Sequence, residues 1–165
     1  MVVLGIDPGL AQTGWGVIET INNRHRLIAY GIVKTKTDKP LEKRIFAIAF
    51  EIGLIATKYN IEQVSMEDIF FAKNVSSAIN VAKVIGAIIQ QLSVQNLEVK
   101  LFTPLQIKSS VTGYGTADKH QVQQMVKLLL KLDGIVKPDH ASDSLAAAIC
   151  FANNRSFTNK VGRIL

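Results

Sequence analysis

The chain has 165 residues, 48% of them hydrophobic, with 4 Pro and 11 Gly, which suits one globular domain and excludes a mainly disordered protein. Its formal charge of +6 favours a polyanionic partner. Residues 1–99 carry 10 basic and 9 acidic side chains, whereas residues 100–165 carry 9 basic and 4 acidic ones. We therefore expect the C-terminal third to build most of the basic surface.

The sequence shows no pattern typical of a secreted or membrane protein. Its apolar stretches are interrupted by Lys, Glu or Gln well before the roughly 18 residues that a membrane span needs. The single cysteine, Cys150, lies among apolar neighbours such as Ile149 and Phe151, which predicts a small core residue. These features predict a protein of the reducing cytoplasm.

The first part of the chain predicts a three-stranded meander. Residues 1–7, 13–20 and 26–35 form β-branched or alternating runs, and turn residues separate them at Pro8-Gly9 and Asn22-Asn23. After Pro40, apolar residues spaced three or four apart indicate a helix. Further strands and helices follow it. The expected helices cover 40–59, 75–96, 118–132 and 139–154, and the expected strands cover 63–69 and 98–102.

This order of elements predicts an α/β domain with a central mixed five-stranded sheet, helices on its faces and the first strand near the centre. The order resembles the RNase H-like fold. It also resembles the opening of each half of the actin-like and sugar-kinase ATPases, so topology alone leaves the function open. Those ATPases duplicate the unit and need over twice this length. We expect one domain over residues 1–154, followed by a basic tail over 155–165.

Three acidic residues lie in apolar surroundings. Asp7 ends a strand and Glu67 lies inside another. Asp143 lies in an alanine-rich helix, on the same face as His140. Each has a plain structural alternative: Asp7 could cap the following turn, and His140 could be an exposed first-turn residue. Converging carboxylates would repel one another unless a cation bound them, and oxygen ligands with one imidazole suit Mg²⁺ or Mn²⁺ better than Zn²⁺.

Four motifs, in order from residue 2 to about residue 154, resemble those of the RuvC Holliday-junction resolvases. They are Gly5-Ile6-Asp7-Pro8-Gly9 with Thr13-Gly14, Glu67-x-x-Phe70-x-Ala72-Lys73-Asn74, Lys108 through Gly113-x-Gly115-x-Ala117-x-Lys119, and Asp139-His140-Ala141-x-Asp143. The resemblance implies a homodimeric, metal-dependent nuclease of DNA recombination and repair that binds four-way junction DNA and makes paired, symmetric nicks. It also implies cooperation with the RuvA–RuvB branch-migration complex.

The same resemblance implies the residues of the site. Many family members carry a carboxylate where this chain has His140, so the site has one negative charge fewer. The implied catalytic and metal-binding residues, holding two Mg²⁺ ions with Mn²⁺ also supporting activity, are Asp7, Glu67, His140 and Asp143. The implied DNA-binding residues are Phe70, Lys73, Lys108 and Lys119, and Tyr114 is a further candidate for base stacking. The resemblance does not include Asp68, and alternation along the strand allows at most one of Glu67 and Asp68 to face the site.

Other functions and roles stay open at this point. A junction-binding module that has lost activity would share the fold, although none of the acids is missing, and so would a related nuclease acting on structured RNA. Phe70 could belong to the core, Tyr114 could be an exposed turn residue, and the two lysines could be ordinary surface residues.

The helix predicted over 75–96 has Lys83 as its only charged residue. A helix that is apolar on more than one side needs a second burial partner, so we predict a two-fold dimer on this helix, with helix 118–132 as the alternative cover. Residues expected against the sheet are Val75, Ile79, Ala82, Ile85, Ile89 and Leu92. Those expected to face outward are Ala78, Val81, Val84 and Ile88.

Overall fold

Five strands form one mixed sheet in the order β3-β2-β1-β4-β5. They are β1 (Val2–Asp7), β2 (Gln12–Ile21), β3 (Arg24–Lys34), β4 (Gln63–Glu67) and β5 (Val99–Phe102). The β1–β2 and β2–β3 pairs are antiparallel, whereas the β1–β4 and β4–β5 pairs are parallel. This computed structural model describes residues 1–69 and 75–161. The predicted mixed sheet with a central first strand is confirmed.

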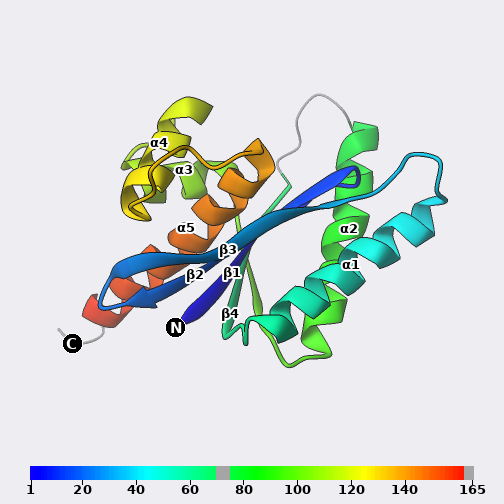
Figure 1. Cartoon of the computed structure of the whole chain (residues 1–165), viewed down its shortest axis with the longest axis horizontal. Coiled ribbons are helices and arrows are strands. Elements are labelled where there is room, and N and C mark those ends of the chain that lie inside the picture. Colours follow the sequence, from blue (N-terminus) through cyan, green and yellow to red (C-terminus); the bar gives the residue numbers. More distant parts are fainter. Residues whose placement is uncertain (70–74, 162–165) are drawn as a thin grey trace.

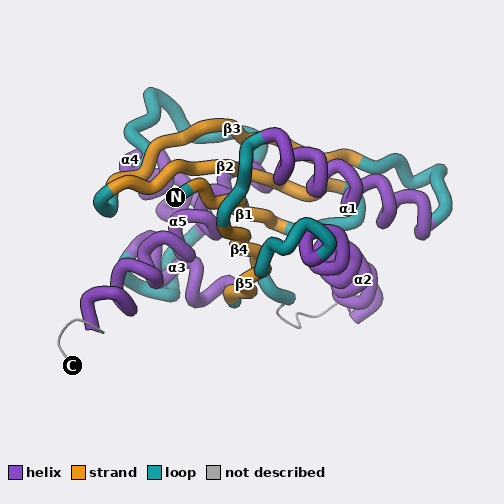
Figure 2. The backbone as a smooth tube through the Cα atoms, turned by 90° about the horizontal axis from the view of Figure 1, so that it is seen from below, coloured by secondary structure: helices purple, strands orange, loops and turns teal. Residues whose placement is uncertain are grey.

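Helices cover both faces of the sheet (Figure 1). Helices α1 (Leu41–Lys58) and α2 (Val75–Ser93) pack on one face, over a core that includes Leu4, Ile6 and Met66. Helices α3 (Pro104–Thr112), α4 (Lys119–Leu129) and α5 (Asp139–Val161) build the core of the opposite face. Figure 2 shows the strands between these two helical layers. The strand β1 is buried from both sides, which explains its nearly continuous apolar sequence.

Helix α5 lies directly against the first two strands because glycines face it there. A Cβ atom at Gly5 would meet the backbone of Ser144 and Ala148, and one at Gly14 would meet the carbonyl of His140. Any larger residue at these positions would push the helix away from the sheet. The two glycines therefore place the first turns of α5 beside the end of β1.

Helix α3 was not expected from the sequence. Its N-cap is Thr103, whose side chain accepts a hydrogen bond from the backbone N–H of Gln106, while the Gln106 side chain accepts one from the Thr103 backbone. This capping box, followed by Pro104 at the first helical position, is a recognised helix start. Only Ile107 and Val111 are fully buried in the helix, so its apolar periodicity is too short to indicate a helix.

The prediction for the faces of α2 is wrong in part. Val84 and Ile88, expected to face outward, are fully buried, whereas Ile79, expected against the sheet, is 49% exposed. Helix α1 packs against α2 and provides the second burial partner within the chain. The alternative that α4 covers α2 is also wrong, because α4 packs on α3 and α5.

Helix α5 continues beyond residue 154 to Val161, so the expected tail over 155–165 begins inside a helix. The division into a domain over 1–154 and a tail over 155–165 stays a prediction. Cys150 is buried, as predicted. Over the residues described, no helix combines the length and the apolar character that crossing a membrane requires.

Candidate active site

Three side chains from two elements meet at the C-terminal end of β1. Asp7 is the last residue of that strand, and His140 and Asp143 lie three residues apart at the start of α5. The Nδ1 atom of His140 lies 2.6 Å from Oδ2 of Asp7. One possible ligand atom from each of the three residues lies within 4.8 Å of the other two. Two carboxylates and an imidazole at this spacing can hold a divalent cation.

Glu67 extends this cluster from the neighbouring strand. It ends β4, which runs parallel to β1 with Met66 opposite Ile6. Burial raises the pKa of Glu67 from its ordinary 4.5 to about 7, and the negative charges of Asp7 and Asp143 add to the rise. Asp68 does not line the cleft that holds Glu67 and Asp143, and its carboxylate accepts a hydrogen bond from the backbone N–H of Ile69.

His140 and Asp143 also have raised pKa values. The hydrogen bond to Asp7 raises the pKa of His140, although partial burial opposes the rise. Burial raises the pKa of Asp143, although the hydrogen bond from Lys119 opposes this. The two shifts have different main causes: a carboxylate partner favours the charged imidazole of His140, whereas burial disfavours the charged form of Asp143.

Two lysines border Asp7, Glu67, His140 and Asp143, the four residues that we call the acidic cluster. Lys108 on α3 and Lys119 at the start of α4 line a cleft of about 210 Å³ together with Glu67 and Asp143. The Nζ atom of Lys119 lies 3.1 Å from Oδ2 of Asp143 and 3.4 Å from Oδ2 of Asp139. Burial lowers the pKa of Lys119, but its hydrogen bonds to these carboxylates outweigh burial and raise it. The cleft thus presents both acidic and basic groups to a ligand.

A family model described as crossover junction endodeoxyribonuclease RuvC matches residues 3–151. The chain belongs to the RuvC family. The RuvC of Alkaliphilus oremlandii is 43% identical over 158 residues, covering 96% of each chain. The RuvC of Clostridioides difficile is 42% identical over 164 residues, covering 99% of this chain and 97% of the relative.

Solved RuvC structures agree with the fold. Thermus thermophilus RuvC matches with a TM-score of 0.90 and 30% identity, covering 96% of this chain and 97% of that one. The structure of T. thermophilus RuvC in complex with Holliday junction substrate gives a TM-score of 0.91 at 30% identity, covering 96% of each chain. The resemblance and the RNase H-like fold expected from the motifs are confirmed.

The expected DNA-binding residues of this RuvC-family chain fall into three groups. Phe70 and Lys73 lie outside the described residues. Lys108 and Lys119 lie in the cleft beside the acids. Tyr114 is 47% exposed, in the turn after α3, and it does not line that cleft.

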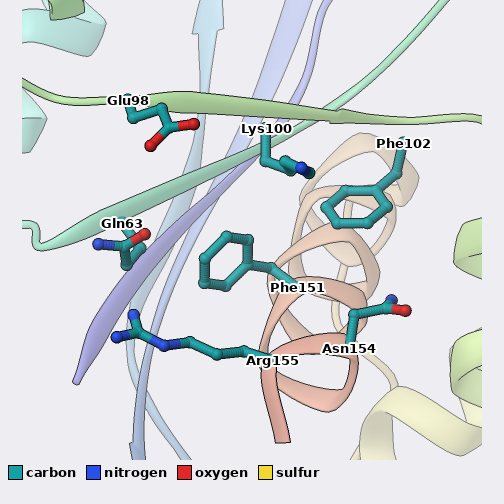
Figure 3. Close-up of a pocket in the computed structure, with 7 residues that line it drawn as sticks. All are labelled: Gln63, Glu98, Lys100, Phe102, Phe151, Asn154 and Arg155. Atoms are coloured by element: carbon teal, nitrogen blue, oxygen red, sulfur yellow. The ribbon is translucent and has the colours of Figure 1, made fainter. Parts of the chain in front are cut away.

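A larger hollow of about 620 Å³ lies along β5 and the later part of α5 (Figure 3). Its floor includes the rings of Phe102 and Phe151, whose centroids are 6.5 Å apart in an edge-on arrangement. None of the four acidic-cluster residues lines it. Volume alone therefore does not mark the chemically equipped site of this molecule.

Sequence reasoning gave no separate role to Asp139 or Gln123. The Oδ1 atom of Asp139 accepts hydrogen bonds from Nε2 of Gln123 at 3.0 Å and from Nζ of Lys137 at 2.8 Å. The bond from Lys137, followed by that from Gln123 and the charge of Lys119, lowers the pKa of Asp139 to about 2. The spacing of four between Lys119 and Gln123 was a usable signal, since it places both on one helix face.

Proposed function

We propose that this chain is a structure-selective endonuclease that resolves Holliday junctions by paired, symmetric, metal-dependent nicks during DNA recombination and repair. The observation that carries the proposal is the convergence of Asp7, His140 and Asp143 at the end of β1, with Glu67 beside them, in a chain of the RuvC family. The solved complex of its T. thermophilus relative with a Holliday junction supports the substrate.

The proposed metal ligands are Asp7, Glu67, His140 and Asp143. Their oxygen atoms and single imidazole fit Mg²⁺, with two ions per subunit, and also fit Mn²⁺. In this site the ligands would hold divalent ions, whose chemistry would be to activate a water and to offset charge on the leaving 3′ oxygen. A bound cation would offset the burial and repulsion that raise the pKa of Glu67, so this carboxylate would stay ionised as a ligand. The ammonium groups of Lys108 and Lys119 can offset the charge of the scissile phosphate.

DNA contacts outside the acidic cluster are assigned by family resemblance. We propose that Lys73 contacts phosphate, while Phe70 and Tyr114 stack on bases near the crossover, where one stacked base contributes about 1–3 kcal/mol. Exposure of the Tyr114 ring supports its part of the proposal. We further propose cooperation with the RuvA–RuvB branch-migration complex, which family membership supports.

Cleavage assays test the proposed function. With Mg²⁺ the chain should nick a four-way DNA junction and leave linear duplex DNA and structured RNA intact. Asp7→Asn should abolish cleavage and keep junction binding within a few-fold. Asp68→Asn is the matched control, because Asp68 lies next to Glu67 in sequence but is not among the residues that line the cleft, and it should keep cleavage. Junction binding without any cleavage would instead indicate a binding module that has lost activity. Preferential cutting of RNA would show that the proposed DNA substrate is wrong.

The proposed homodimer uses the exposed face of α2. Ile79 is 49% exposed on this face, Ala82 and Gly86 are also exposed, and a Cβ atom at Gly86 would meet no atom within 4 Å. Small residues allow another backbone to approach closely, which suits a two-fold contact.

Substitution on this exposed face tests the dimer without disturbing the core. Gly86→Glu should give a folded monomer by sedimentation equilibrium and should uncouple the paired nicks. Ser93→Glu, also exposed but in the last turn of α2, is the control and should remain dimeric. A monomeric unmutated chain that still makes paired nicks at micromolar concentration would contradict the proposal.

A further inference from the structure

Lys119 is shared between two carboxylates of α5. Its Nζ atom lies 3.1 Å from Asp143, a member of the acidic cluster, and 3.4 Å from Asp139, which is not in the cluster. A cation that binds Asp143 would share that carboxylate with the ammonium group and would be repelled by its positive charge. The position of the ammonium group is therefore linked to metal binding.

Asp139 is held so that one of its oxygens faces Lys119. Its Oδ1 atom is already occupied by hydrogen bonds from Gln123 and Lys137, while Oδ2 is the atom nearest Lys119. Gln123 is only 5% exposed and lies one turn after Lys119 on α4, so the helix that carries the lysine also fixes its second partner. A buried amide fixes a carboxylate more firmly than an exposed side chain does, because it has few alternative partners.

Two simpler roles would not need this geometry. An acid in the first turn of a helix favours the helix dipole, and the neighbouring Lys137 offers Asp139 a local ion pair. Neither role requires Asp139 to share the ammonium group of a lysine from another helix.

We propose that Asp139 is a positioning residue that retains Lys119 when Asp143 becomes a metal ligand. The inference rests on the proposed metal-dependent function. With Asp139 present, Lys119 keeps an anionic partner after it releases Asp143 and stays beside the cleft, where the phosphate would bind. Without Asp139, the ammonium group is left with Asp143 as its carboxylate partner and competes more strongly with the cation.

A double-mutant cycle on Mn²⁺ affinity tests the inference. Free Mn²⁺ is measured by electron paramagnetic resonance in titrations of the DNA-free protein at constant ionic strength. Asp139→Asn should raise the Mn²⁺ dissociation constant about threefold, since the ion pair is half exposed and partly screened. Lys119→Met should lower that constant, because the competing cation is gone. In the Lys119→Met background, Asp139→Asn should change it less than about 1.5-fold.

Three controls separate positioning from a general effect of charge or folding. Asp133→Asn removes an exposed acid from the preceding loop and should leave Mn²⁺ affinity unchanged. Asp139→Glu keeps the carboxylate and should restore affinity to within about twofold of the unmutated chain. Urea denaturation should show that each variant is folded at the titration temperature.

The outcomes separate this inference from the proposed function. If Asp139→Asn changes the Mn²⁺ dissociation constant equally with and without Lys119, the carboxylate acts through its own electric field. If it changes that constant in neither background, Asp139 has no role in Mn²⁺ binding. Either result would overturn the inference. If the unmutated chain binds Mn²⁺ and cuts junctions, the proposed function survives either result. Failure of the unmutated chain to bind Mn²⁺ would overturn both.

Discussion

Replacing Glu67 by Gln should stabilise the metal-free protein at alkaline pH. The pKa of Glu67 rises from its ordinary 4.5 to about 7 in the folded chain. Each tenfold change in a protonation equilibrium corresponds to about 1.4 kcal/mol, so ionised Glu67 lowers the free energy of unfolding by about 3 kcal/mol at pH 8. Because solvent partly reaches and screens Glu67, we expect Glu67→Gln to raise the free energy of unfolding at pH 8 by about 2 kcal/mol.

The sign of the pH dependence follows from the same shift. Between pH 4.5 and about 7 the folded chain binds more protons at Glu67 than the unfolded chain does, so this contribution to stability is complete below pH 4.5 and is lost as the pH rises through about 7. Glu67→Gln should therefore raise the urea midpoint strongly at pH 8 and only slightly at pH 5, with EDTA present throughout. It should also abolish cleavage.

A matched control separates burial from the loss of any acid. Glu51 is exposed on α1, and Glu51→Gln should change the urea midpoint by the same small amount at both pH values. Equal urea midpoints for Glu67→Gln and the unmutated chain at pH 8 would refute the reasoning, because the buried carboxylate would then carry no electrostatic cost.

Further predictions concern other parts of the chain. Burial lowers the pKa of His25 below 6.5. The stabilising contribution of His25 is therefore complete above pH 6.5 and is lost as the pH falls through the pKa of the folded chain. His25→Gln should reduce the drop in urea midpoint between pH 7 and pH 5. Gly5→Ala should cost roughly 1–3 kcal/mol and impair cleavage by displacing α5, whereas Gly134→Ala, which meets no neighbouring atom, should do neither. His140→Asp should narrow the advantage of Mn²⁺ over Mg²⁺ in cleavage titrations, and identical titrations would contradict this. Lys108→Ala should reduce the salt dependence of junction binding by about one unit of slope at most.

The sheet was predictable because its signals are local. Alternation, turn residues and the apolar run of β1 suffice to place all five strands. Helix α3 was missed because a nine-residue helix with two fully buried side chains has little periodicity, and its capping box at Thr103 was the stronger signal. The faces of α2 were misassigned because an apolar helix does not reveal which side another helix covers, and in the fold α1 buries Val84 and Ile88.

The residues of the acidic cluster could be predicted from the sequence, whereas their contacts with the neighbouring lysine could not. Motifs located Asp7, His140 and Asp143, and the structure brings these three together. The sharing of Lys119 between two carboxylates depends on how α4 packs beside α5, and no motif states that tertiary contact.

Close packing of α5 on the sheet links the fold to the chemistry of the site. Because β1 has Gly5 where α5 crosses it, the helix approaches the strand directly, and its first turns bring two side chains to Asp7. The same packing partly buries Glu67 and Asp143, which raises their pKa values. The negative charges of Asp7 and Asp143 add to the rise at Glu67, and a bound cation would offset this repulsion. If α5 packed less closely, the acids would stay hydrated and would gain less from binding a cation. Gly5 therefore supports the proposed site indirectly, because it sets how closely α5 approaches β1.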